Sequence, residues 1–423
     1  MSELAGSSPL AALFDRRRWL TLADWLAVAV AFSLPWSTSL TSILIILWLL
    51  ALTPTLRLAD AVGEIAQPAS GLPVLLCLLG LVGALWSAAD IGEQLHAIKG
   101  FPKLLVIPFL FIQFRRSDRA HLVLGGFLVS CTALLVTSWI LHFWIAQPWR
   151  VGLSGVPVKD YIVQSVEFLI CAVAVAHLAV EAWGRHRHLL AAGLTVAALL
   201  FLANIAFVAT GRTSLVAFPV LLVLFGLQRF GLRGTLAIAL GGLLFAGLIW
   251  FSSPYLRGRA LGAIDEIQRY HSSSAETSAG FRLEFWKKSV GFVAEAPVLG
   301  HGTGSIPILF GRAGGSESGI GAAITGNPHN QTLEIAIQFG LVGVVVLYAM
   351  WIAHALAVSG SGLYAWLGQA LVAQTVVGSL FLSYVLDFST GWLYVFGVGV
   401  LGGAVARNHG TIARAARANE PSR

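Results

Sequence analysis

Apolar segments long enough to cross a lipid bilayer recur along most of the chain, and no other feature limits its possible folds so strongly. Of its 423 residues 57% are hydrophobic and 11% charged, and the mean hydropathy is +0.80. A helix needs about 20 apolar residues to span the hydrocarbon core. Since a soluble domain does not tolerate this balance, the composition predicts an all-α polytopic membrane protein.

Apolar runs and their breaks predict about twelve membrane-spanning helices. The expected ranges are 25–36, 39–55, 71–88, 102–114, 120–146, 161–183, 188–209, 213–229, 235–251, 330–357, 362–385 and 389–406. Three arginines at 16–18 precede the first run as in a signal peptide, but eleven further spans favour an uncleaved first helix. The chain then divides into spans one to nine over 1–251, a large loop over 252–328, spans ten to twelve over 329–406 and a basic tail over 407–423.

The distribution of Lys and Arg predicts the orientation. Of the 27 Lys and Arg residues, 15 fall on the side of the two termini, five in the short connections opposite and seven in the large loop. Short connections rich in cations stay in the cytoplasm, whereas long loops are exported largely regardless of charge. We therefore expect cytoplasmic termini, and we expect the 252–328 loop and the turn that carries Arg212 on the exported side. Basic loops beside anionic lipid explain the net charge of +7 without a nucleic-acid partner.

The sequence indicates neither disulfide nor metal chemistry. Cys77, Cys131 and Cys171 all fall inside predicted spans, so the exported loop has no thiol to oxidise. His, Cys and acidic residues do not cluster at the spacing of metal ligands. We therefore expect no metal and no other cofactor.

The 252–328 loop is the one long polar segment between spans. Apolar residues at helical spacing predict helices over 257–271 and 281–294, lying half-buried against the bundle. Pro297 would end the second helix, and the glycines of 300–304 would form a turn. Such a turn is able to present backbone N–H groups to a phosphate, although a plain turn is the simpler interpretation.

The junction of this loop with the tenth span carries the strongest candidate for chemistry, Asn327-Pro328-His329-Asn330-Gln331. A structural interpretation makes Asn327 the N-cap and places Pro328 in the first turn, but it does not explain the His329–Asn330 pair. An imidazole titrates near neutral pH, and the positive end of a helix would keep it neutral, which is the form a general base needs. We therefore expect His329 to act as a base.

Two arginines are candidates for binding an anion. Arg212 opens a span on the exported side, where the positive-inside rule depletes cations, and arginine is suited to bidentate phosphate binding. The structural alternative for Arg212 is an interfacial side chain that reaches the lipid headgroups. For Arg282, on the second predicted loop helix, a solvated position is the simpler explanation.

The run His329-Asn330, nine residues, Gly340, two residues and Gly343 resembles the signature of the O-antigen ligase family. In that signature a His is followed by Asn, Ser or Gln, nine residues, Gly, two residues and then Gly, Thr or Tyr. The segment 211–215, the helix of Arg282 with the segment 297–304 after it, and the twelve-span layout are similar to that family too. Polysaccharide polymerases and protein O-glycosylating relatives share the signature.

The resemblance implies a metal-independent, inverting glycosyltransferase of GT-C-like architecture in the bacterial inner membrane, active on the periplasmic side in lipopolysaccharide biosynthesis. It would move an O-antigen glycan from undecaprenyl diphosphate to a hydroxyl of a lipid A-core sugar. His329 would take the proton of that hydroxyl, and Arg212 and Arg282 would neutralise the diphosphate. Gly340 and Gly343 would permit close helix contact. Supporting roles would fall to Asn330, Gln331, Glu334, His301 and Lys103, the last holding lipid phosphate or reaching the headgroups.

Other functions fit parts of the same pattern. A polysaccharide polymerase attacks the same donor and is not distinguished by these residues. A protein O-oligosaccharyltransferase usually has extra exported C-terminal sequence, whereas this chain ends at 423 after a last span expected to end at 406. A transporter or flippase for the lipid-linked glycan concentrates ionisable residues near mid-membrane in repeated halves, whereas here Glu167 is the main acidic residue inside a span and no repeat is visible.

Overall fold

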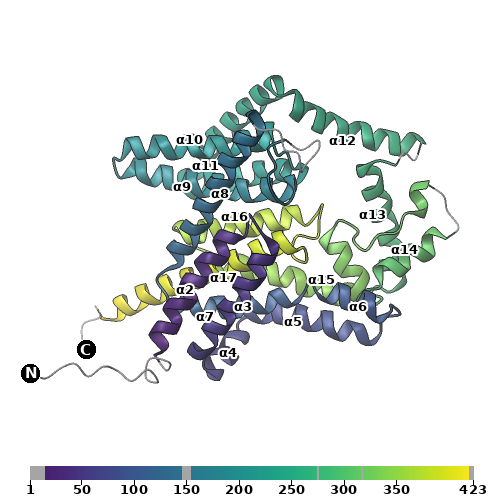
Figure 1. The fold of residues 1–423 in the computed structure, drawn as a ribbon, viewed down its shortest axis with the longest axis horizontal. Coiled ribbons are helices and arrows are strands. Elements are labelled where there is room, and N and C mark those ends of the chain that lie inside the picture. Colours follow the sequence, from purple (N-terminus) through teal and green to yellow (C-terminus); the bar gives the residue numbers. More distant parts are fainter. Residues whose placement is uncertain (1–14, 145–153, 274–275, 316–318, 419–423) are drawn as a thin grey trace, which may run out of the picture.

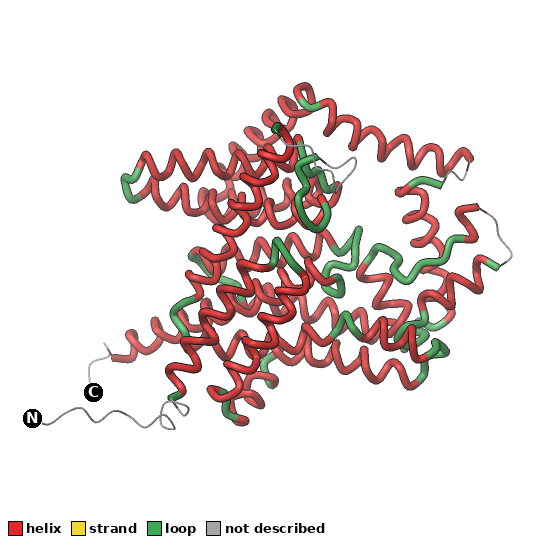
Figure 2. Tube along the Cα trace, viewed as in Figure 1, coloured by secondary structure: helices red, strands yellow, loops and turns green. Residues whose placement is uncertain are grey.

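The computed structural model describes residues 15–144, 154–273, 276–315 and 319–418. Within these ranges the chain forms helices joined by loops and turns, without any strand (Figure 2). Nine stretches of the described residues are long and apolar enough to cross a membrane. The prediction of an all-α, multi-pass membrane protein is therefore confirmed.

In chain order the helices are α2 (Arg16–Ser33), α3 (Thr38–Leu52), α4 (Leu58–Ile65), α5 (Pro68–Val82), α6 (Ile91–Ile98), α7 (Val106–Arg116), α8 (Ala120–Phe143), α9 (Tyr161–Gly184), α10 (His188–Phe207), α11 (Arg212–Ser252), α12 (Pro254–Ser273), α13 (Ser278–Glu295), α14 (Ile306–Gly314), α15 (Gln331–Ala357), α16 (Leu363–Gly378) and α17 (Phe388–Ala418), with 3-10 turns at Thr53–Thr55, Gly83–Leu85, Pro102–Leu105 and Gly319–Ala322.

The predicted spans agree with the helices in number only in part. The two spans predicted over 213–229 and 235–251 correspond to the two parts of α11, which a break at Gly231, where φ is 64°, separates. Helices α2 and α16, which correspond to the first and eleventh predicted spans, are not among the nine stretches that are long and apolar enough. Each predicted span thus has a helical counterpart, and the number twelve stays a prediction.

Several predicted boundaries differ from the structure, and one cannot be compared. The first span was expected from 25, but α2 begins at Arg16. The eleventh span was expected over 362–385, but α16 ends at Gly378 and residues 379–387 form a loop. The last helix was expected to end at 406, but α17 continues to Ala418, so the start of the basic tail prolongs the helix. The expected end of the fifth span at 146 lies outside the described residues.

The segment 252–328 forms a separate layer at one end of the molecule. Figure 1 shows α12, α13 and α14 at the end opposite to the first residues of α2 and the last residues of α17. Helices α12 and α13 agree with the two predicted loop helices, whereas α14 was not predicted. A small apolar cluster packs α13 and α14 on the first turns of α15, through Phe285, Phe292, Ile306, Leu309, Phe310 and Ile337.

Helix α15 is broken at Gly340, where φ is 58° and ψ is −151°, a conformation that is essentially restricted to glycine. The break leaves backbone groups without partners in their own helix, and the segment 297–302 supplies the missing partners. Four hydrogen bonds join the two segments: His301 N–H to Ile337 O (2.8 Å), Gly302 N–H to Gln338 O (2.9 Å), Leu341 N–H to Pro297 O (2.8 Å) and Val342 N–H to Val298 O (3.2 Å). Since unpaired backbone groups are costly in a membrane, this contact fixes the end of the exported layer to the bundle.

The Gly340→Ala variant tests this contact. An added Cβ would lie 2.4 Å from the carbonyl of Val298, on a backbone that strains any side chain. We expect a loss of stability of about 2 kcal/mol or more, measured as thermal unfolding of the purified protein in detergent. The matched control is Gly193→Ala in α10, where an added Cβ meets no atom within 4 Å and stability should hold. Equal melting temperatures for Gly340→Ala and the unsubstituted protein would show that α15 does not depend on the break.

Candidate active site

His329 lies in the loop before α15, in a backbone conformation that two neighbours hold. Its φ is 55°, a left-handed conformation that histidine adopts more readily than most side chains. The backbone N–H of His329 donates to Asn327 Oδ1 at 2.7 Å, and the Trp286 indole of α13 donates to the carbonyl of Pro328 at 3.0 Å. These two hydrogen bonds hold the loop in place, and the loop conformation sets the orientation of the His329 side chain.

The tenth span was expected over 330–357 and α15 runs from Gln331 to Ala357, but the predicted N-cap, Asn327, is wrong. The N-cap is Asn330, whose Oδ1 accepts from the N–H of Leu333 at 3.0 Å, and the helix begins at Gln331. Asn327 shapes the loop instead of capping the helix. Because His329 precedes the N-cap, it does not lie in the first turn of the helix.

Burial and a neighbouring charge favour a neutral His329 ring. The side chain is half-buried, and burial together with the positive charge of Arg282 lowers the pKa of His329 below its usual value. The ring lies roughly parallel to that of Phe285, with 6.4 Å between centroids. Its Nδ1 is buried, and no residue within the described ranges hydrogen-bonds to it. A neutral imidazole is able to accept a proton from a bound molecule that reaches one of its ring nitrogens.

Arg212 and Arg282, far apart in sequence, face one small cavity of about 160 Å³. Arg212 is the first residue of α11, and Arg282 lies on α13 in the exported layer. Burial and the neighbouring charge of Arg212 lower the pKa of Arg282. Among the described residues, none forms a hydrogen bond or ion pair with Arg282, whereas Arg212 pairs with Glu266 of α12 at 2.7 Å. Two guanidinium groups around one cavity are suited to a ligand with more than one negative charge.

His329 lines a larger cavity of about 410 Å³. Its wall carries three carboxylates, Glu93 of α6, Glu334 of α15 and Asp387 of the loop after α16. Consecutive residues of that loop line the two cavities, Leu382 the arginine cavity and Ser383 the His329 cavity. The site therefore has a cationic compartment and an acidic, polar compartment, with His329 in the wall of the latter and within reach of the charge of Arg282.

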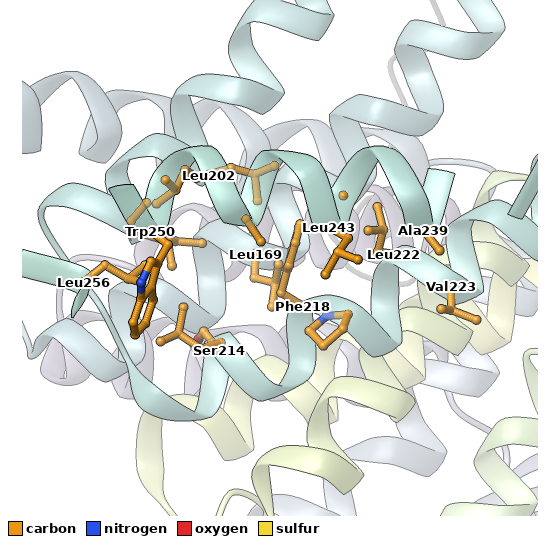
Figure 3. A pocket seen from close by; sticks show the side chains of 17 residues that line it. Leu169, Leu202, Ser214, Phe218, Leu222, Val223, Ala239, Leu243, Trp250 and Leu256 are labelled. Carbon is orange, nitrogen blue, oxygen red and sulfur yellow. The ribbon is translucent and has the colours of Figure 1, made fainter. Parts of the chain in front are cut away.

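A third, apolar cavity of about 420 Å³ begins beside Arg212. Thr213 lines the arginine cavity and Ser214 lines the apolar one, so the two follow each other along the start of α11. Figure 3 shows Ser214 and Trp250 toward one end of this cavity and Val223 and Ala239 toward the other. Its walls come from α9, α10, both parts of α11 and the start of α12, and they are almost entirely hydrocarbon.

Residues 196–348 match the model of a family described as O-antigen ligase. The matched segment includes both arginines, His329 and the glycines at 340 and 343. The chain contains an O-antigen ligase family domain. A comparison with curated proteins finds no match.

In this O-antigen ligase domain and around it, three predicted supporting residues hold the 379–387 loop in place. Asn330 Nδ2 donates to the carbonyl of Leu380 at 3.0 Å. Gln331 Oε1 accepts from the N–H groups of Val385 (2.9 Å) and Leu386 (3.3 Å). The Lys103 ammonium is buried and donates to the carbonyls of Leu386 (2.7 Å) and Asp387. This geometry favours a positioning role for Lys103 over the predicted contact with lipid phosphate.

The remaining predicted residues also have local partners. Glu334 lines the His329 cavity and accepts from Gln331 Nε2 at 3.3 Å, and no hydrogen bond between Glu334 and His329 is found in the described part of the chain. The His301 ring bonds to the carbonyl of Phe292 at 2.8 Å, beside the break in α15. Gly340 contacts loop backbone at Val298, and an added Cβ at Gly343 would meet Phe339 of its own helix at 2.5 Å. The close contacts of both glycines are therefore not with a neighbouring helix.

Sequence reasoning missed several residues that the fold brings to the site. Glu266 is one of several charged residues on a predicted loop helix, and nothing local distinguishes it from the others. Its ion pair with Arg212 joins residues 54 positions apart in the chain. Asp387 lay between two predicted spans, where a carboxylate bordered by apolar runs is the only signal available. Trp286 was part of the quoted Arg282 segment, but nothing in the sequence predicted its bond to Pro328.

The Arg282→Gln variant tests the electrostatic coupling in the site. A positive neighbour disfavours the imidazolium, so its removal should raise the pKa of His329, and protonation should begin at a higher pH. The measurement is the pH dependence of diethylpyrocarbonate modification of the peptide that contains His329, read by mass spectrometry. Lys287→Gln is the matched control, because Lys287 is exposed on the same helix and does not affect His329. An unchanged midpoint in Arg282→Gln would contradict the coupling.

Proposed function

We propose that the chain is an O-antigen ligase that transfers O-antigen glycan from undecaprenyl diphosphate to a lipid A-core sugar hydroxyl. The family match supports an enzyme of the ligase and polymerase type. The observation that carries the proposal is the imidazole of His329, whose Nδ1 has no hydrogen-bond partner among the described residues and which lies within the field of Arg282, a residue that shares a cavity with Arg212. The proposal includes twelve spans in a GT-C-like arrangement in the inner membrane, with cytoplasmic termini and the site on the periplasmic side.

The donor would occupy two adjoining compartments. Its diphosphate would lie between Arg212 and Arg282, whose charges match its own. Its polyprenyl chain would enter the apolar cavity that begins at Ser214, since hydrocarbon walls favour such a chain. The change from polar to apolar lining between Thr213 and Ser214 supports this placement, because diphosphate and lipid meet at one bond in the donor.

The acceptor sugar would occupy the larger cavity beside His329. Carboxylates at Glu93, Glu334 and Asp387 are able to accept hydrogen bonds from sugar hydroxyls. In the proposed reaction the acceptor oxygen attacks the anomeric carbon while its proton passes to a ring nitrogen of His329. The bond from that carbon to the diphosphate oxygen breaks, and undecaprenyl diphosphate leaves with its charge neutralised by the arginines. One displacement inverts the anomeric configuration.

The His329→Ala variant and a set of acceptors test this proposal together. With purified protein and undecaprenyl-diphosphate glycan, we expect transfer to lipid A-core and a loss of about 100-fold or more in His329→Ala. His121→Ala is the control, since His121 is exposed at the start of α8. Normal transfer by His329→Ala would exclude His329 as the base. Transfer only to a second lipid-linked glycan would identify a polymerase, and transfer only to a peptide would identify a protein O-oligosaccharyltransferase.

Metal removal provides a further test. Because two guanidinium groups are available to neutralise the leaving diphosphate, the proposed reaction needs no divalent cation. Transfer measured after treatment with EDTA and desalting should remain within about twofold of the untreated rate. Activity that disappears and returns with added Mg²⁺ would contradict a metal-independent mechanism.

A further inference from the structure

The carboxylate of Glu266 occupies a place with the features of a phosphate site. Its Oε1 lies 2.7 Å from Arg212 Nη2, and its Oε2 lies 3.3 Å from Arg212 Nη1. The same Oε2 accepts the N–H of Ala279 at 2.9 Å, in the first turn of α13, whose N-cap is Thr277. An arginine fork together with the free N–H groups of a helix start is an arrangement that binds phosphate oxygens.

The two arginines have hydrogen-bond donors and positive charge that the carboxylate of Glu266 does not satisfy. The Nε of Arg212 is buried, and no acceptor for it is present among the described residues. Arg282, a turn after the Ala279 N–H on α13, lines the same cavity as Glu266 and forms no ion pair within the described ranges. A single carboxylate therefore satisfies only part of a site that can hold a diphosphate.

We infer that Glu266 is an internal competitor that holds the diphosphate site of the donor until the donor displaces it. This inference rests on the proposed function and adds a regulation to the same site. On binding, phosphate oxygens take over the Arg212 fork and the Ala279 N–H, and the Glu266 side chain moves aside. After transfer, the return of Glu266 to Arg212 competes with the diphosphate product and speeds its release.

A purely structural role for Glu266 predicts the opposite effect on binding. If Glu266 serves to hold Arg212 in the correct position, its neutralisation weakens anion binding. If Glu266 competes with the anion, its neutralisation strengthens binding. The two roles differ in the sign of a measurable change, so one variant separates them.

The test is the binding of inorganic pyrophosphate to the full chain in nanodiscs of uncharged lipid, measured by isothermal titration calorimetry. For Glu266→Gln we expect a dissociation constant lower by roughly three- to tenfold than for the unsubstituted protein, since a competing, partly exposed ion pair is removed. The matched control is Asp265→Asn, because Asp265 is the adjacent carboxylate, pairs with Arg269 and is exposed. That control should leave the dissociation constant unchanged. An unchanged or higher constant in Glu266→Gln overturns the inference.

A second variant separates this outcome from a failure of the proposed function. Arg282→Gln should weaken pyrophosphate binding whether or not Glu266 competes. If Arg282→Gln binds less tightly and Glu266→Gln binds no more tightly, only the competitor is excluded. If neither the unsubstituted protein nor Glu266→Gln binds pyrophosphate, both the competitor and the diphosphate site are excluded. If Glu266→Gln does not fold, Glu266→Asp replaces it, since the shorter carboxylate contacts Arg212 less well, and tighter binding is again the expected result.

Discussion

The arrangement of the site depends on the break in α15 at Gly340. A broken helix in a membrane exposes backbone groups that lipid cannot satisfy, and here the segment 297–302 satisfies them. This contact fixes the end of α13 to the bundle, while the Phe285–Ile337 cluster fixes its middle. Arg282 lies on α13 and His329 lies just before α15. The backbone hydrogen bonds between the segment 297–302 and α15 therefore set the distance between the Arg282 guanidinium and the His329 imidazole.

A second constraint places the wall of the larger cavity. Residues 379–387 do not continue α16, since the side chains of Gln331 and Lys103 capture their backbone groups. The loop thereby contributes Ser383 and Asp387 to the His329 cavity and Leu382 to the arginine cavity. The hydrogen bonds from these buried side chains stabilise the loop, because water is scarce there and each unpaired backbone group costs free energy. Lys103 thus acts on the site through the loop.

The sequence predicted more of the site's chemistry than of its geometry. His329, Arg212 and Arg282 were identified from residue type, predicted side of the membrane and resemblance, and the fold brings all three to two cavities that share one loop in their walls. The N-cap of α15 was misassigned because Asn327 and Asn330 are equally good caps by type, and only the backbone decides between them. The contributions of burial and of Arg282 to the neutral imidazole were not predicted, because they depend on residues distant in sequence.

By itself the sequence determined that the chain is a bundle of membrane helices with one large polar segment, because hydrophobic length and charge distribution are local properties. It also determined that a glycine stands at position 340. Only the tertiary structure decided that this glycine breaks a helix, that Glu266 pairs with Arg212, and that residues 379–387 form the cavity wall. Each of these is a pairing between segments far apart in the chain. Composition and periodicity describe each segment alone, so they cannot determine which segments meet.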